Sequence, residues 1–104
     1  MKLCLLYTTF SDRKEAEKIA QQLVENKLSA CCNISNQMMS VFFWQEKVSQ
    51  EKEFFLLVKT LPSLVDKCTD FILANHSYDV PCILSMMLPV NEEFFNWANK
   101  QLLD

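Results

Sequence analysis

A lone histidine and a nearby cysteine are the residues of this sequence best suited to bind a metal ion. His76 is the only histidine, and Cys82 follows it after a short stretch that contains Asp79. An imidazole and a thiolate form a soft ligand pair that suits copper or zinc, but two ligands are too few for a closed site. A third ligand could come from Asp79 or from another subunit. The alternative is that His76 is a loop residue whose ring is hydrogen-bonded to the backbone.

A second group of residues could form a ligand cleft. Their side chains supply ring surface, cations and an acid, and they gather near expected strand ends and the loop around Asp79. The alternative for each is a surface charge or an interface aromatic. The group consists of Tyr7, Trp44, Lys47, Glu51, Lys59 and Tyr78, together with Asp79.

Composition excludes several kinds of catalytic or nucleotide site. The chain contains no glycine, so it lacks the Walker loop and the dinucleotide fingerprint, which both need glycine where backbone meets phosphate. With one histidine and no evident nucleophile beside it, no catalytic triad can be assembled. We therefore expect a protein that is not an enzyme.

The other cysteines are expected to pack in the protein rather than bind metal. Cys31 and Cys32 are neighbours on an expected strand, so their side chains face opposite ways and cannot easily share a metal ion or form a disulfide. Cys4 and Cys68 lie in apolar stripes typical of core residues. The odd total of five cysteines favours free thiols in a reducing cytoplasm.

The elements that must position these residues are organised around a long hairpin. Two apolar runs, Val41–Trp44 and Phe54–Val58, flank a polar stretch, Gln45–Glu53. The density of Phe, Val, Trp and Leu in these runs favours strands. The polar stretch is too short for a crossover helix, so the strands are predicted to pair antiparallel. Neither run alternates apolar with polar residues, so both faces of the sheet must be covered.

The rest of the chain predicts strands and helices in alternation. Asp12 opens a helix as part of a plausible capping box, and Pro62 suits the first turn of a second helix. Asn91 is expected to cap a final helix, which should bury Phe94, Trp97 and Leu102. The expected segments are strands 2–9, 28–34 and 82–90, a break or bulge at 35–37, helices 12–26 and from 62 to a loop at 75–78, and a helix from 91 onward.

These elements predict a single α+β domain over residues 1–104, with the order β-α-β-β-α-β and a C-terminal helix. Right-handed crossovers would place both main helices on one face of an antiparallel sheet. The other face would remain apolar, and burying each large side chain there is worth about 1.5–3 kcal/mol. Several such residues could exceed an association cost of about 4–15 kcal/mol, so we predict an obligate homo-oligomer.

Charge and hydropathy argue against two kinds of partner. The net charge is −3 and the basic residues are not clustered, so the electrostatic signature of a nucleic-acid-binding protein is absent. No apolar run approaches the roughly 18 residues that a membrane span needs. The apolar start of the chain is not followed by a small-residue cleavage site. We therefore expect a cytoplasmic protein that binds neither nucleic acid nor membrane.

Several segments, in a fixed order, resemble those of a known family. They are T-T at Thr8-Thr9, L-V-E-N-K-L-S-A-C-C-N-I at Leu23–Ile34, S-V-F-F-W-Q-E-K at Ser40–Lys47, V-K-T at Val58–Thr60, H-S-Y-D-V-P at His76–Pro81, and the helix around Trp97. Over essentially the whole chain they resemble the CutA family of divalent-cation tolerance proteins. The resemblance implies a ferredoxin-like fold similar to the PII signalling proteins, assembled as a tight homotrimer with ligand clefts between subunits. It also implies binding of copper or another divalent metal ion, with no established catalytic reaction.

The chain departs from the family pattern at the candidate ligands. The ligands proposed in some members are a cysteine at the end of the first strand, a histidine, and a glutamate; these positions look like Tyr7, His76 and Cys82 here. The hairpin turn also lacks the family's glycine, because Gln45-Glu46 stands there. Two other functions remain as alternatives: a PII-like signalling module that binds a small anionic metabolite between subunits, and a structural trimer that scaffolds a partner protein.

Overall fold

Strands and helices alternate to build an α+β domain around one antiparallel sheet. The computed structural model describes residues 1–102. The predicted order is confirmed, with the second strand in two pieces. The elements are β1 (Lys2–Phe10), α1 (Arg13–Glu25), β2 (Cys31–Ile34), β3 (Met38–Trp44), β4 (Lys47–Thr60), α2 (Val65–Asn75), β5 (Ile83–Pro89) and α3 (Glu92–Gln101), with a 3₁₀ turn, Pro62–Leu64, before α2.

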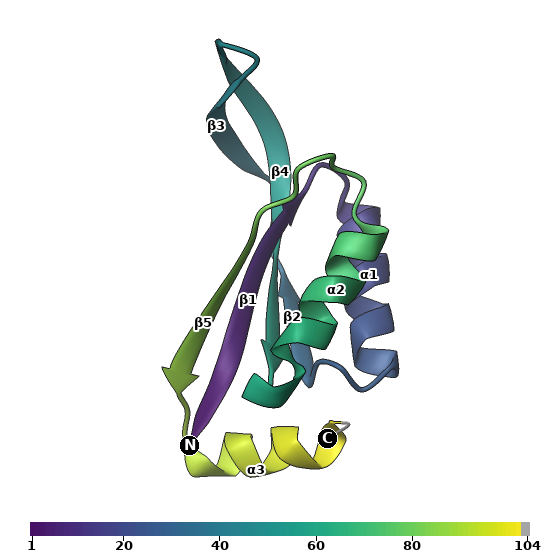
Figure 1. Cartoon of the computed structure of the whole chain (residues 1–104), viewed down its shortest axis with the longest axis vertical. Coiled ribbons are helices and arrows are strands. Elements are labelled where there is room, and N and C mark those ends of the chain that lie inside the picture. The colour runs from purple at the N-terminus through teal and green to yellow at the C-terminus, as the bar shows by residue number, and fades with distance from the viewer. Residues whose placement is uncertain (103–104) are drawn as a thin grey trace.

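Strands β4 and β1 form the centre of the sheet, which runs β2-β4-β1-β5 (Figure 1). Strand β3 pairs with the first half of β4, Lys47–Glu53, and β2 pairs with the second half. Strand β3 therefore continues β2 along the same edge of the sheet. Ile34 faces Leu56, whereas Met38 faces Glu53, so the segment Ser35–Gln37 opposes a stretch of β4 that is one residue shorter. The extra residue is a β-bulge, and it confirms the break or bulge predicted at this point.

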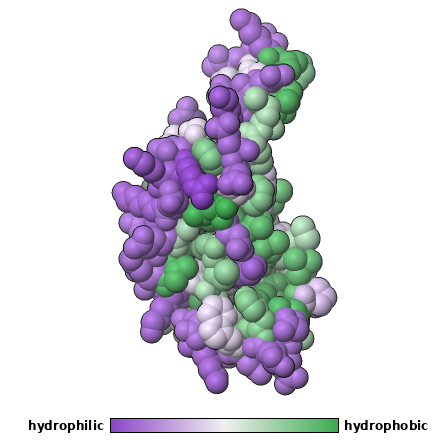
Figure 2. All heavy atoms as spheres, turned by 180° about the vertical axis from the view of Figure 1, so that it is seen from behind, coloured by the Kyte–Doolittle hydropathy of each residue, from purple (hydrophilic) through white to green (hydrophobic). Residues whose placement is uncertain are grey.

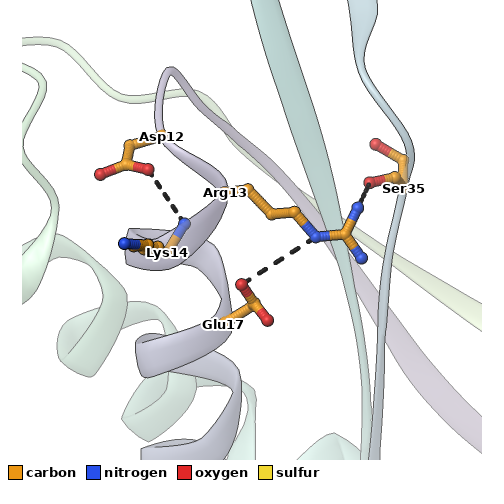
Figure 3. Close-up of polar contacts among 5 residues, drawn as sticks. All are labelled: Asp12, Arg13, Lys14, Glu17 and Ser35. Atoms are coloured by element: carbon orange, nitrogen blue, oxygen red, sulfur yellow. Dashed lines mark hydrogen bonds and ion pairs between the residues drawn. The ribbon is translucent and has the colours of Figure 1, made fainter.

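Helices α1 and α2 both cover one face of the sheet (Figure 1). Helix α1 begins at the predicted cap, where the Asp12 carboxylate accepts a hydrogen bond from the Lys14 N–H at 3.0 Å. Arg13 lies 4.0 Å from Glu17 on the next turn and donates to the Ser35 carbonyl at 3.4 Å (Figure 3). The start of α1 is therefore tethered to the bulge between β2 and β3.

Helix α1 ends beside Asn26, as predicted, but the left-handed residue is Lys27, with φ of 59°. The N–H groups of Lys27 and the following residue bond to carbonyl oxygens in the last helical turn, which is the Schellman pattern. The residues Leu28–Ala30 belong to this connection. Strand β2 therefore begins at Cys31, later than predicted.

Two hydrophobic clusters hold the elements together. The main cluster lies between the sheet and helices α1 and α2, and the smaller one packs α3 against the end of the sheet. The main cluster consists of Cys4, Leu6, Phe10, Ala16, Ile19, Ala20, Leu23, Leu56, Val58, Cys68 and Ile72. The smaller cluster consists of Leu3, Ala30, Leu61, Leu64, Ala98 and Leu102.

The prediction that Trp97 is buried is wrong, because its side chain is 46% exposed. Helix α3 buries Ala98 and the residue that follows its last turn, Leu102. Residues four apart lie on one face of a helix, so Trp97 lies to the side of this stripe. There its ring packs on Phe94 with centroids 5.5 Å apart.

The hairpin is longer and its turn tighter than predicted. The stretch Gln45–Glu53 was expected to connect the strands, but Gln45 and Glu46 alone form the turn, and β4 starts at Lys47. Both turn residues have positive φ, 50° and 65°, as in the type I′ turn whose twist matches that of paired strands. The polar residues after the turn fit a strand because this arm of the hairpin extends beyond the core, where its side chains reach water (Figure 1).

The sheet face opposite α1 and α2 carries many exposed apolar side chains. Figure 2 shows hydrophobic residues gathered on one side of the molecule, whereas the surface on the opposite side of that view is mostly hydrophilic. On β5 alone, Leu84, Met86 and Leu88 are exposed, and they face the same way because they alternate along the strand. Within residues 1–102, only the smaller α3 cluster covers part of this face. We name the exposed remainder, centred on Leu84 and Met86, the open face.

Candidate functional site

An open groove of about 560 Å³ lies between the β3-β4 hairpin and the segment that leads into β5. The groove brings together more than half of the residues proposed from the sequence. These are Trp44, Glu51, Tyr78, Asp79 and Cys82. The other residues that line it are Thr9, Ser11, Ser40, Val41, Phe42, Glu53 and Val80.

His76 lies beside the groove, and both of its ring nitrogens have protein partners. Nε2 is 2.8 Å from the Thr9 carbonyl oxygen, and Nδ1 accepts a hydrogen bond from the Tyr78 N–H at 3.1 Å. Because Nδ1 accepts, Nε2 carries the proton and donates to Thr9. The ring also stacks on Phe10, with centroids 4.3 Å apart. In this arrangement the imidazole fastens the loop to β1 and leaves no free lone pair for a metal ion.

Two glutamates hold the same loop from different sides. The Glu15 carboxylate accepts hydrogen bonds from both the N–H and the hydroxyl of Ser77, each at 2.8 Å. The Tyr78 hydroxyl donates to Oε2 of Glu53 at 2.5 Å. Burial, reinforced by the hydrogen bond to Glu53, raises the pKa of Tyr78 well above its ordinary value. These bonds fix the loop that presents Asp79 to the groove.

Tyr7 and Lys47 lie near the groove without lining it. The Tyr7 ring packs on Phe55 with centroids 5.8 Å apart. Burial, and then the negative charge of Glu53, raises the pKa of Tyr7. Lys47 is exposed beside the hairpin turn, opposite Trp44.

Lys59 lies towards the other end of the sheet. Its Nζ is 3.9 Å from Sγ of Cys31 and 5.6 Å from the centre of the Phe94 ring. It borders a second cavity of about 310 Å³, lined largely by apolar residues of β1, β5 and α3. The structure therefore separates Lys59 from the groove residues with which it was grouped.

The five cysteines are all free. Burial raises the pKa of Cys4, Cys32 and Cys68, and that of Cys68 reaches about 11. Cys32 packs against the main core, whereas Cys31 points to the other face and approaches Lys59. The opposite orientation predicted for the two neighbouring cysteines is confirmed. Cys82 is exposed at the groove.

One copy of the chain supplies metal donors of suitable chemistry but no complete set of ligands. Across residues 1–102, no three His, Cys, Asp or Glu side chains are grouped closely enough to hold a metal ion. The groove does contain the Cys82 thiol and the carboxylates of Asp79 and Glu51. A thiolate with carboxylates suits a divalent ion such as zinc or copper, so a site here needs at least one donor from outside this chain.

Glu53 and Phe42 are two of the seven groove residues that sequence reasoning did not propose. The signal was strand alternation: Glu53 lies two residues after Glu51, so both carboxylates face the same side. Phe42 likewise shares a face with Trp44, and Ser40 on that face pairs with Glu51. The sequence interpretation treated Gln45–Glu53 as a connection, so strand alternation was not applied to Glu51 and Glu53.

The fold and the comparisons identify the class of this protein. An antiparallel sheet with two helices on one face, in the order β-α-β-β-α-β, defines a ferredoxin-like α+β domain. Residues 4–101 match the model of the family described as CutA1 divalent ion tolerance protein. The chain belongs to this family.

Relatives and solved structures cover nearly the whole domain. A divalent-cation tolerance protein CutA from Archaeoglobus fulgidus is 36% identical, over 91% of this chain and 93% of that protein. The crystal structure of CutA1 from Ehrlichia chaffeensis has a TM-score of 0.92 at 36% identity, over 95% and 94% of the two chains. CutA1 from Oryza sativa has a TM-score of 0.95 at 30% identity, over 100% and 96%.

Some relatives are longer than this chain. The chain spans 52% of the chloroplastic CutA protein of Arabidopsis thaliana, to which it is 35% identical. A solved structure of CutA from Archaeoglobus fulgidus is described as that of a periplasmic protein. In the described residues 1–102, every helix is too short or too polar to span a membrane.

Proposed function

We propose that this protein acts in divalent-cation tolerance as a non-catalytic homotrimer that binds copper or another divalent metal ion. The observation that carries the proposal is the groove, where the exposed Cys82 thiol lies with the carboxylates of Asp79 and Glu51. Family membership supports the role in cation tolerance.

In this proposal, Cys82 and Asp79 are metal ligands and the remaining donors come from another copy. One chain has no group of three donors within residues 1–102, and the open face favours association with other copies. His76 could bind the ion only by giving up its bond to Thr9 or to Tyr78. Its role in the resting structure is to position the loop that carries Asp79.

The free thiols support function in a reducing compartment, and we place the protein in the cytoplasm. All five cysteines are unpaired, and Cys82 is exposed. An exposed thiol persists where glutathione and thioredoxin keep thiols reduced. A thiolate ligand for a soft metal ion requires the same condition.

The groove favours this proposal over the alternative of an anionic metabolite. Its lining includes the carboxylates of Glu51, Glu53 and Asp79 and contains no lysine, arginine or histidine. Negative charge at this density repels an organic acid or a nucleotide phosphate. Of the two cations proposed for such a ligand, Lys59 lies at a different cavity, and Lys47 lies beside the hairpin turn and does not line the groove.

Metal analysis of the purified protein, followed by calorimetric titration with Zn²⁺ and Cu²⁺ in thiol-free buffer, tests the proposal. We expect saturable binding that Cys82→Ser and Asp79→Asn each weaken at least tenfold, because each removes a charged donor. Cys31→Ser is the matched control, since it removes a partly exposed thiol far from the groove. Saturable heat that survives both groove substitutions, or no heat at all in the wild type, would rule this site out.

A further inference from the structure

A thiol and an ammonium group lie against each other where β2 pairs with the end of β4. Cys31 and Lys59 are direct partners in this antiparallel pair, so their side chains lie on the same face of the sheet. Sγ of Cys31 is 3.9 Å from Nζ of Lys59. The thiol is free, and Lys59 forms no ion pair with any other residue of the described range 1–102. The nucleophile and the amine are therefore both available to react.

Hydrogen bonds fix the backbone on both sides of this pair. Oγ of Ser29 is 3.0 Å from the carbonyl oxygen of Cys31 and 3.0 Å from that of Lys59. The Ala30 N–H donates to the same Lys59 carbonyl at 3.0 Å. Ser29 is 1% exposed, so water does not compete for these bonds. Because the two backbones are held together, rotation of the long lysine side chain is enough to bring Nζ closer to Sγ.

The cavity of about 310 Å³ next to Lys59 gives a small oxidant room to approach. Of the lining residues in the part of the chain that the structure describes, Lys59 is the only charged one. No carboxylate of the lining therefore holds the ammonium in place, and its other neighbour is the Phe94 ring at 5.6 Å. Hydrogen peroxide is little larger than water, and a cavity of this size admits several water molecules.

We propose that Cys31 and Lys59 form a reversible covalent bridge, Sγ–O–Nζ, when the protein meets peroxide. The bridge links β2 to β4 and removes the only charge from the lining of the cavity, because a nitrogen bonded to oxygen is far less basic than a lysine amine. Thiols that reduce the bridge restore the original pair. The site shares no residue with the proposed metal ligands, Asp79 and Cys82, and goes beyond the function proposed for them.

The reaction consumes two molecules of peroxide for each bridge. The Cys31 sulfur attacks the first peroxide, so that an S–O bond forms, the O–O bond breaks and water leaves, which gives a sulfenic acid. The Lys59 ammonium loses a proton to solvent, and the second peroxide oxidises the amine nitrogen as its own O–O bond breaks. Formation of the N–O bond keeps one oxygen atom in the bridge. Sulfur and nitrogen each lose two electrons, and three molecules of water are released in all.

Treatment of the assembled wild-type protein with hydrogen peroxide, in buffer with a chelator, tests the proposal. After the peroxide is removed and free thiols are alkylated, mass spectrometry should show a species that has gained one oxygen atom and lost two hydrogen atoms. Its Cys31 should resist alkylation, and trypsin should not cleave after Lys59. Dithiothreitol should return the original mass, because the bridge is reducible.

Conservative variants separate the bridge from general oxidation. Lys59→Arg keeps the positive charge without an amine, and Cys31→Ser removes the sulfur, so neither should form the bridged species. Cys32→Ser is the matched control: it removes the neighbouring thiol, which packs against the main core, and the bridge should persist.

The proposal is overturned if the wild type forms no bridged species, as would occur if assembly keeps peroxide from the pair. It is also overturned if Cys31 is oxidised only to sulfinic or sulfonic acid while Lys59 stays unmodified, or if the same mass appears in Lys59→Arg. Because a chelator is present throughout, failure of the metal proposal leaves this result unchanged. Loss of metal binding in Cys82→Ser likewise carries no consequence for the bridge.

Discussion

The Cys68 thiol shows how burial affects a single titratable residue of this fold. It lies on the inner face of α2, fully buried in the main core, and donates to the Leu28 carbonyl at 3.1 Å. Burial raises its pKa from an ordinary value of 9.0 to about 11. The folded protein therefore holds this proton more tightly than the unfolded chain does, and stability is linked to pH.

We predict that Cys68 makes the protein lose stability in mild alkali. Its contribution is fully present below pH 9 and is lost as pH rises towards 11, because the unfolded thiol ionises first. The loss should reach about 2–3 kcal/mol. Denaturant unfolding of the wild type and Cys68→Ala, at several pH values across this window, measures the difference between them.

The matched control for this measurement is Ile72→Val, a substitution in the same cluster that keeps the thiol. It should lower the free energy of unfolding by about 0.5–1.5 kcal/mol with the pH dependence of the wild type. If Cys68→Ala and the wild type lose stability in parallel, Cys68 does not carry the effect.

The side-chain chemistry of single residues was enough to predict part of the candidate site from the sequence. Cys82 and Asp79 were chosen for their donor atoms and do lie in the groove. The bonds that occupy both nitrogens of His76 come from Thr9 and from a backbone N–H two residues on. Sequence spacing cannot reveal the first partner, because it depends on how β1 meets the loop in three dimensions.

At the scale of elements, the hairpin turn carries a local strain that substitution can relieve. Gln45 and Glu46 both have positive φ, a conformation that costs a residue with a Cβ about 1–2 kcal/mol relative to glycine. Type I′ turns prefer Asn-Gly for this reason. We predict that the double substitution Gln45→Asn with Glu46→Gly stabilises the protein by about 1 kcal/mol, measured as a rise in the denaturant midpoint at fixed protein concentration.

A glycine elsewhere on the hairpin should have the opposite effect. Gln50 lies within β4, pairs with Val41, and is not among the positive-φ residues. Gln50→Gly should therefore destabilise the protein by about 0.5–1 kcal/mol. A midpoint that falls in the Asn-Gly variant would show that the native turn is not strained.

The sequence predicted the elements well and their junctions less well. Helical spacing and the Asp12 cap located α1, because these signals are local. The length of β4 was underestimated, because a strand that leaves the core needs no apolar residues and Lys47–Glu53 read as a loop. The burial of Trp97 was also misjudged, since the docking angle of α3 is set by its contacts with Leu3 and its neighbours rather than by its own pattern.

At the scale of the whole molecule, a single copy leaves the apolar side chains of the open face exposed to water. Leu84 and Met86 are each 57% exposed on β5, which is an edge strand of the sheet. Apolar patches and free strand edges of this kind mark interaction surfaces in soluble proteins. A homotrimer would bury the patch and pair the edges.

We predict that the wild-type protein is trimeric at micromolar concentration and that Leu84→Lys with Met86→Lys converts it to monomers. Each lysine would place a charge in a buried apolar interface, at a cost of several kcal/mol. Light scattering gives the mass, and a melting temperature that rises with protein concentration gives independent evidence of association.

Leu73→Lys is the control. Leu73 is 50% exposed in one copy, but it lies on α2, on the other side of the sheet, so the trimer should persist. A wild type that scatters as a monomer, or a double variant with unchanged mass, would mean that the open face is not where the copies meet.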